Sequence, residues 1–267
     1  MEANMKRMFW KVAAVLLCLI CSGTVMAEEI VIVGTGSGMA LLRTVGNEFS
    51  KTHPDVKITV PESIGSSGGI KAVGTDQAVV GRVGRKLKDT EAHYGLAYIP
   101  FVRLPIVFFV NKSVGIKDIT PQQACDIYSG KITNWKEVGG KDARIKVVRR
   151  EDGDSSLLVL LESLPGFKDI VITDKSKTTL SDQETLEFVA SKEDTIAFGT
   201  YGDAKSSQVD VLTFGGKKPD ESDYPYTGSL ALIVKEKNNT GNIKAFADFV
   251  ISPETHAIIR EAGGLPF

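Results

Sequence analysis

The stretch IVIVGTGSGMALLRTVGNEF, residues 30–49, decides the fold class of this chain. An apolar run at 30–33 leads into the glycine-rich Gly34–Gly38, and apolar residues then recur from Leu41 to Phe49 at the spacing of one helix face. This order predicts a β-strand, a tight turn and an amphipathic α-helix.

The same order returns further along the chain. Val56–Val60 alternates apolar and polar residues and precedes Gly65–Gly69, a second flexible turn after which Ile70 begins a short helical pattern. The apolar run Ile145–Val148 precedes the loop Arg149–Ser156 and another helical pattern. Strands that alternate with helices predict an α/β fold with mostly parallel sheets.

Capping signals and short apolar runs predict the remaining elements. Thr120 with Gln123, and Ser181 with Glu184, each form a capping box that marks a helix start. Further strands are expected at 78–80, 106–110, 196–198 and 230–234, and further helices at 157–164, 243–250 and 257–259.

Three of the loops share a design that suits an anion. Each follows a strand, is rich in Gly, Ser or Thr, and opens a helix, whose first turn offers unpaired N–H groups and a partial positive charge. Glycine lets the backbone approach a ligand, and hydroxyl groups add donors. The loops are Gly34–Gly38, Gly65–Gly69 and Arg150–Ser156, and they predict an anion site.

Competing motifs fit less well. Gly34-Thr35-Gly36 resembles the start of a dinucleotide fingerprint, but Met39 stands where the third glycine belongs. No Gly-Lys-Ser/Thr sequence closes a P-loop, and Ser37 lacks the flanking glycines of a G-x-S-x-G motif. No nucleophile and base stand at a recognisable spacing, so we expect neither an enzyme nor a cofactor.

The N-terminal residues have the pattern of a secretory signal peptide. Basic residues precede the apolar run Val12–Ile20, and small residues then lead to Ala27. The run is shorter than the roughly 20 residues that span a membrane, which disfavours an anchor. We expect residues 1–27 to be a signal peptide cleaved after Ala27, and the mature protein to be soluble and periplasmic.

Charge and cysteine content exclude further classes. The 267 residues have a net charge of −1, and cleavage would remove three basic residues and one acidic one, leaving about −3. A nucleic-acid-binding protein would need a strongly basic face. Cys125 would be the one cysteine left, and we interpret it as a buried apolar residue. The histidines are scattered, so we expect no metal site, and we expect a monomer.

Several motifs resemble those of the periplasmic phosphate-binding proteins of bacterial ABC importers. They are Gly34–Ser37, Gly65–Lys71, the stretch DIYSGKITNW at 126–135 and the tail at 249–266. The resemblance covers nearly the whole chain after residue 27, and Tyr128–Trp135 is its most specific part. It implies the type II periplasmic-binding fold, with two lobes that are each a mostly parallel sheet flanked by helices, two crossing strands, and a ligand in the cleft.

The expected lobe boundaries lie at two strands. The strand at 106–110 leaves the first α/β unit, and the strand at 230–234 returns to it. We therefore expect lobe 1 to comprise residues 28–109 and 227–267, and lobe 2 to comprise residues 110–226.

The resemblance also implies which residues hold the anion. Amides and hydroxyls of the first loop, one serine of the second loop, an arginine before the third loop and the donors within it would contact the ligand. They correspond to Thr35, Gly36, Ser37, Gly38, Ser66, Arg150, Asp154, Ser155 and Ser156.

Two residues depart from the family's pattern. Many phosphate binders place an aspartate after the third strand to accept a proton from phosphate, but here 81–85 reads GRVGR, so Arg85 joins the expected ligand-binding residues. Asp154 stands where a serine is usual. It would take over the acceptor role, indicate another ligand, or only cap a helix. Whether Arg82 and Arg85 face the cleft or form an exposed basic stretch stays open.

These observations predict a protein that captures phosphate and delivers it to the membrane permease of an ABC importer. Two alternatives remain: the same fold tuned for sulfate, molybdate or tungstate, and an anion sensor without a transport role.

Overall fold

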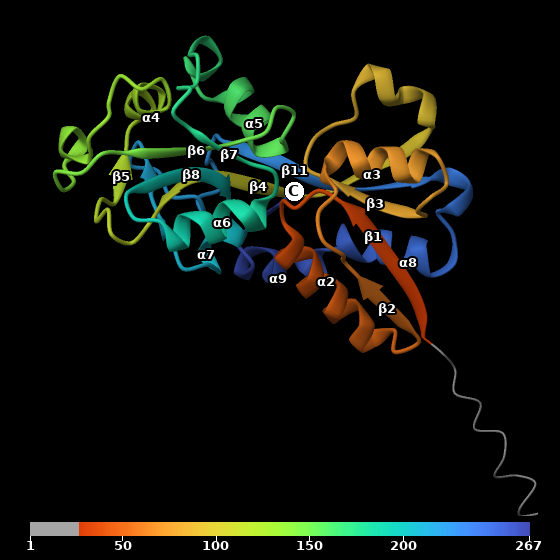
Figure 1. Cartoon of the computed structure of the whole chain (residues 1–267). Helices are drawn as coiled ribbons and strands as arrows, with labels where there is room; N and C mark the ends of the chain where they lie inside the picture. Colours follow the sequence, from red (N-terminus) through yellow and green to blue (C-terminus); the bar gives the residue numbers. More distant parts are fainter. Residues whose placement is uncertain (1–26) are drawn as a thin grey trace, which may run out of the picture.

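The computed structural model describes residues 27–267, so the expected signal peptide lies, except for Ala27, outside the described part. Figure 1 shows a mixed α/β protein with two halves side by side. In each half, parallel strands alternate with helices, which confirms the expected fold class.

The first half is built on three parallel strands. β1 (Glu28–Gly34) lies between β2 (Val56–Thr59) and β3 (Val80–Val83). α2 (Met39–Thr52) connects β1 to β2, and α3 (Gly65–Gly74) connects β2 to β3. Because the strands are parallel, the loops that follow β1, β2 and β3 meet at one edge of the sheet.

One strand, β4 (Leu96–Val110), belongs to both halves. Residues 96–105 pair antiparallel with β11 (Thr227–Lys235), which also pairs with β3 in the first half. Residues 106–110 pair antiparallel with β8 (Thr195–Thr200) in the second half. The strands therefore form one path, β2-β1-β3-β11-β4-β8-β6-β7, in which β4 is the join.

The end of the chain completes the first half. α8 (Gly241–Val250) and α9 (His256–Glu261) precede the short β12 (Leu265–Pro266), which pairs with β4. α2, α8 and α9 lie on one face of the sheet, and α3 lies on the other (Figure 1).

The second half repeats the alternation of strand and helix. β6 (Lys146–Arg150) runs parallel to both β7 (Lys177–Thr179) and β8. α5 (Ser155–Ser163) follows β6, and α6 (Asp182–Ser191) joins β7 to β8. The other strands and α-helices of this half are β5 (Asp118–Ile119), α4 (Pro121–Tyr128), α7 (Tyr201–Lys205), β9 (Asp210–Val211) and β10 (Thr213–Phe214). The 3₁₀ helices of the two halves are η1 (Asp89–Tyr94), η2 (Trp135–Val138), η3 (Phe167–Asp169), η4 (Glu236–Asn238) and η5 (Pro253–Thr255).

Two separate hydrophobic cores accompany the two halves. The main core of the first half gathers Leu42 and Phe49 with residues of α8, while that of the second gathers Phe108 and Tyr128, whose rings lie 5.6 Å apart. We propose that these cores mark the two expected lobes. Because the side chains of 106–109 pack in the second core, the proposed boundary on β4 lies after Pro105.

Three predicted elements have different bounds in the structure. α3 begins at Gly65 and not at Ile70, so the glycine-rich stretch forms its first turns. β3 extends to Val83. β4 begins at Leu96, well before the predicted strand. The sequence pattern missed this first part because Pro100 interrupts the apolar run, whereas in the structure an irregular register against β11 accommodates Pro100.

Within residues 27–267, no helix is long and apolar enough to cross a membrane.

Substitutions in the two cores test the proposed lobes. Leu42 and Leu160 are fully buried, one in each core, so Leu42→Ala and Leu160→Ala should each lower the free energy of unfolding by about 2–5 kcal/mol. Amide hydrogen exchange should accelerate mainly in the half that carries the substitution. Equal acceleration in both halves for both variants would argue against two lobes.

Candidate functional site

The first loop turns from β1 into α2. It leaves the strand at Gly34 (φ 140°) and enters the helix after Gly38 (φ 72°), conformations in which a side chain would be strained. Thr35 and Ser37 are buried, and their hydroxyl oxygens lie 3.4 and 3.3 Å from Oγ of Ser155 in the second half. This loop therefore meets the third loop directly across the halves.

The second loop lies at the start of α3. Ser66 is buried in its first turn, and Oγ of Ser66 accepts a 3.1 Å hydrogen bond from the N–H of Gly84. The amide of Gly65 donates to Oγ of Ser63. These residues bring hydroxyls and the N-terminus of a ten-residue helix to the cleft.

The third loop carries the charge of the site. β6 ends at Arg150, whose side chain is buried, and α5 begins at Ser155. Asp154 is the N-cap of α5, because its carboxylate accepts a 2.9 Å hydrogen bond from the N–H of Leu157. Capping was one of the roles left open for Asp154, and the structure shows that it is present.

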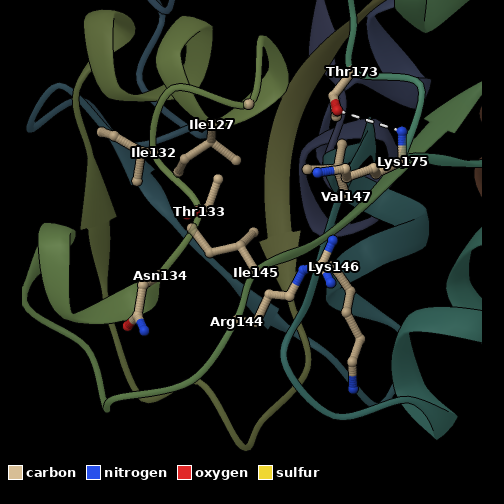
Figure 2. A pocket seen from close by; sticks show the side chains of 11 residues that line it. Ile127, Ile132, Thr133, Asn134, Arg144, Ile145, Lys146, Val147, Thr173 and Lys175 are labelled. Atoms are coloured by element: carbon tan, nitrogen blue, oxygen red, sulfur yellow. Dashed lines mark hydrogen bonds between the residues drawn. The ribbon is translucent and has the colours of Figure 1, made fainter.

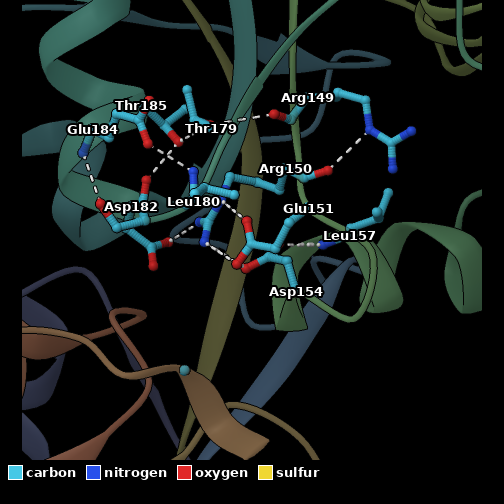
Figure 3. Close-up of polar contacts among 12 residues, drawn as sticks. Arg149, Arg150, Glu151, Asp154, Leu157, Thr179, Leu180, Asp182, Glu184 and Thr185 are labelled. Atoms are coloured by element: carbon cyan, nitrogen blue, oxygen red, sulfur yellow. Dashed lines mark hydrogen bonds and ion pairs between the residues drawn. The ribbon is translucent and has the colours of Figure 1, made fainter. Parts of the chain in front are cut away.

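Arg150 is surrounded by carboxylates (Figure 3). Its Nε lies 3.0 Å from Glu151, its Nη2 lies 3.1 Å from Asp154, and its Nη1 lies 3.0 Å from Asp182. The last pair is an ion pair without hydrogen-bonding geometry, and Nη1 has no hydrogen-bond partner in the described part of the chain. Nη1 therefore faces the Asp182 carboxylate, yet its N–H groups make no hydrogen bond within the described residues and can donate to a ligand.

Three carboxylates surround the single guanidinium of Arg150, and this excess of negative charge affects the pKa values at the site. Burial first, and then the charge of Asp182, raise the pKa of Asp154 to about 7 and outweigh the attraction of Arg150. Burial opposes the charge of Arg150, but Asp182 and Asp154 outweigh it and raise the pKa of Arg150. A proton is therefore easily held among these groups near neutral pH.

Asp182 is a site residue that the sequence did not reveal. It is the first residue of α6 and is 5% exposed. A Cβ on Gly36 would lie only 2.3 Å from Oδ2 of Asp182, so the absence of a side chain at Gly36 lets the two halves approach. The capping box at Ser181 predicted the helix start, but nothing in the sequence placed that start at the cleft.

Asp203 is a second missed residue, and it joins the halves. It lies in α7 of the second half, yet its Oδ2 accepts a 3.0 Å hydrogen bond from the N–H of Gly38 at the start of α2. Thr200 also donates to Asp203. Burial first, and then Asp182, raise the pKa of Asp203 to about 6. The N–H of Gly38, an expected ligand donor, is therefore used by Asp203 in this structure.

The three loops enclose a cavity of about 180 Å³, which we call the loop cavity. Of the expected residues, six line it. They are Thr35, Gly36, Ser66, Arg150, Asp154 and Ser155. The structure adds seven more lining residues from the same loops and from α6. They are Ser63, Gly65, Ser67, Glu151, Asp152, Gly153 and Asp182.

Four expected residues do not line the loop cavity. Ser37 faces Ser155, and Gly38 binds Asp203. Ser156 is buried inside α5. Arg85 is 9% exposed, and its guanidinium is held by two 2.8 Å hydrogen bonds to Glu91 and one of 3.0 Å to Oγ of Ser67, which itself lines the cavity. Arg82 is also buried, so the exposed basic stretch considered from the sequence is wrong.

A larger hollow of about 520 Å³ lies elsewhere in the second half (Figure 2). Arg144, Lys146 and Lys175 line it, and all three are exposed. Lys146 begins β6 while Arg150 ends it, so this hollow is at the opposite end of the strand from the loop cavity. The stretch Tyr128–Trp135 borders it and has a structural role, since Trp135 is buried and donates to the carbonyl of Asp194.

Within residues 27–267, no group of three His, Cys, Asp or Glu side chains could hold a metal ion. The carboxylates of the loop cavity instead surround Arg150. Cys125 is buried in the second core, and burial raises the pKa of its thiol.

Comparison with known proteins gives consistent results. A family model described as "PBP superfamily domain" matches residues 22–254. The chain is 25% identical to the phosphate-binding protein PstS of Bacillus subtilis (strain 168), over 89% of this chain and 80% of that protein, and 23% identical to PstS of Borreliella burgdorferi, over 89% and 90%. Among solved structures, it resembles a putative phosphate ABC transporter substrate-binding protein with bound phosphate from Clostridium perfringens. The TM-score is 0.79 and the identity 30%, over 90% of this chain and 100% of that one.

The buried aspartates should make the ligand-free protein more stable in mild acid. The pKa values of Asp154 and Asp203, about 7 and about 6, lie above the ordinary value of 3.8. At pH values between the ordinary pKa of 3.8 and these raised pKa values, the folded protein binds more protons than the unfolded chain. The free energy of unfolding therefore rises as the pH falls through this range. Melting temperatures at about pH 8 and about pH 5.5 should show this rise, and Asp154→Asn and Asp203→Asn should each reduce it.

Asp152→Asn is the matched control, because the side chain of Asp152 is 94% exposed, and it should keep the wild-type pH dependence. If Asp154→Asn and Asp203→Asn also keep the wild-type pH dependence, Asp154 and Asp203 are not the groups whose protonation stabilises the folded protein in mild acid.

Proposed function

Because the chain belongs to the PBP superfamily, we propose that it captures inorganic phosphate in the loop cavity and delivers it to the membrane permease of an ABC importer. The observation that carries this proposal is the buried Arg150, whose Nη1 makes no hydrogen bond within the described residues, in a cavity lined by hydroxyls from both halves. Arginine offers a planar set of donors that suits tetrahedral oxyanions. The relatives are phosphate-binding proteins by name, and we propose binding and transport, not catalysis.

Helix starts and hydroxyls support an anionic ligand. α3 and α5 both begin at the loop cavity, and their first turns carry unpaired N–H groups and a partial positive charge. Ser66 and Ser155 add hydroxyl groups at those same helix starts. Together with Arg150, they form donors on several sides of a small oxyanion.

The carboxylates favour phosphate over a fully ionised oxyanion. Phosphate keeps at least one proton near neutral pH, and a carboxyl group whose pKa is about 7 can share that proton with it. Sulfate has no proton of its own, so it depends on a proton already held by Asp154 and otherwise meets repulsion from Asp154, Asp182 and Glu151. Protonation therefore distinguishes phosphate from the alternative ligands with the same shape.

The location and the movement of the protein follow from the same proposal. We propose that the mature chain acts in the periplasm as a monomer, after removal of residues 1–27. The two proposed lobes would open to admit phosphate and close over it, which shifts a hinge equilibrium toward the form that the permease recognises.

Calorimetry with phosphate, sulfate, molybdate and tungstate tests this function. Wild-type protein should bind phosphate most tightly, and Arg150→Ala should weaken phosphate binding by about tenfold to a few hundredfold, since a charge-assisted hydrogen bond is worth about 1.5–3 kcal/mol. Arg149→Ala is the control, because the Arg149 side chain points away and pairs with Asp152. A preference for sulfate or tungstate would overturn the phosphate assignment, and unchanged affinity in folded Arg150→Ala would remove Arg150 from the site.

Asp154→Ser separates the acceptor role from the capping role. Serine caps a helix about as well as aspartate but can donate a hydrogen bond to a fully ionised anion. The ratio of phosphate to sulfate affinity should therefore fall in Asp154→Ser. It should stay constant in the control Asp142→Ser, because the side chain of Asp142 is 72% exposed and lies outside the loop cavity. If Asp154 serves only as the N-cap of α5, the two variants will have the same ratio.

A further inference from the structure

Arg82 is a buried arginine that the proposed site does not use. It lies on β3, has no exposed surface, and is among the largest fully buried side chains of the described chain. A buried guanidinium is costly unless its donors are satisfied, so its partners show what it does.

The guanidinium of Arg82 binds only backbone carbonyls. Nε donates to Thr35 at 2.7 Å, Nη2 donates to Pro61 at 2.7 Å, and Nη1 donates to Ile32. Ile32 and Thr35 belong to β1 and the first loop, and Pro61 begins the connection from β2 to the second loop. One side chain thus ties together the two loops that the first half contributes to the loop cavity.

The bond to Thr35 orients a donor on the other side of the loop. In a planar trans peptide, the carbonyl and the N–H point in opposite directions. Arg82 holds the Thr35 carbonyl behind the loop, so the N–H of the same peptide, which belongs to Gly36, points away from Arg82. Gly36 lines the loop cavity, and no hydrogen bond of its N–H appears among residues 27–267.

The charge of Arg82 also lacks a partner. In the described part of the chain, no carboxylate forms an ion pair with it, and the nearby Glu62 pairs at 3.3 Å with Arg43. Burial lowers the pKa of Arg82 to about 10, which leaves the guanidinium protonated at neutral pH. An unpaired charge in a low-dielectric interior acts strongly on nearby charges, so a bound anion would be attracted to it.

We infer that Arg82 is a positioning residue of the anion site, which aims the Gly36 N–H at the ligand and adds an unpaired positive charge behind the first loop. This inference rests on the proposed function. It also explains how a cavity rich in carboxylates can still attract an anion, because Arg82 and Arg150 together offset part of the negative charge of Glu151, Asp154 and Asp182.

Two substitutions separate the two proposed roles of Arg82, the orientation of the Gly36 N–H and the supply of a positive charge. Arg82→Met removes the charge, and Arg82→Lys keeps the charge but has one ammonium group in place of a fork that reaches three carbonyls. Phosphate carries mostly one charge at about pH 5.5 and mostly two at about pH 8.5, and the effect of a fixed charge grows with the charge of the ligand. Each variant is compared with wild type at the same pH, since Asp154 and Asp182 face the ligand in all of them.

Arg82→Met should weaken phosphate binding at both pH values, with a loss about tenfold larger at about pH 8.5 than at about pH 5.5, as one more ligand charge predicts. Arg82→Lys should weaken binding at about pH 5.5, where a buried ammonium group keeps its charge better than at about pH 8.5. Arg43→Gln is the control, because Arg43 also donates to a backbone carbonyl, that of Val60, but is exposed, and its affinity should stay within about twofold of wild type.

Equal losses for Arg82→Met at the two pH values would overturn the role of the charge, and wild-type affinity in Arg82→Lys would overturn the role in aiming Gly36. If neither variant folds, NMR of wild-type protein decides, because the Gly36 amide proton should move downfield on addition of phosphate, and an unmoved resonance contradicts the inference. Wild-type protein that binds no phosphate would instead overturn the proposed function itself.

Discussion

β4 hydrogen-bonds to β11 along residues 96–105 and to β8 along residues 106–110, so the two sheets share one backbone segment. Because β11 runs beside β3 and β8 runs beside β6, this sharing brings the loops after β1, β2 and β6 to the same cleft. The cavity thus depends on the pairing of β4 with β11 and β8, strands whose own residues do not line it. The shared strand explains how the hydroxyl oxygens of Thr35 and Ser155, which are 120 positions apart in the sequence, come within 3.4 Å of each other.

Charge at the site is arranged in two layers. Arg150 and its carboxylates line the cavity, while Arg82 lies behind the first loop and contacts only carbonyl groups. Under the proposed function, the carboxylates would limit which protonation states of a ligand are accepted, and the cations would supply attraction that the acidic lining lacks. A separate ion pair, Arg85 with Glu91, is buried beside the cavity. Arg85 also donates a 3.0 Å hydrogen bond to Oγ of Ser67, which lines the cavity, and so links the chain after β3 to the second loop.

Local patterns predicted much of this fold, because helix starts and short apolar strands are encoded by neighbouring residues. The Thr120–Gln123 capping box is present as predicted, and the first loop turns into a helix as its glycines indicate. Nonlocal features were not predictable in this way. The first part of β4 is held by pairing with β11 despite Pro100, the role of Arg82 depends on carbonyls from three other segments, and Asp182 reaches the site only because the halves meet.

The hydrogen bond from Gly38 to Asp203 joins the halves without contacting the loop cavity. For a protein that closes over its ligand, the apparent dissociation constant equals the intrinsic one divided by the fraction of molecules already closed. Under the proposed closure, Asp203 would act on the population of the closed form and not on the chemistry of recognition. Evolution can retune such a receptor to scarce or abundant nutrient by changing this one contact, while the set of anions that it distinguishes stays the same.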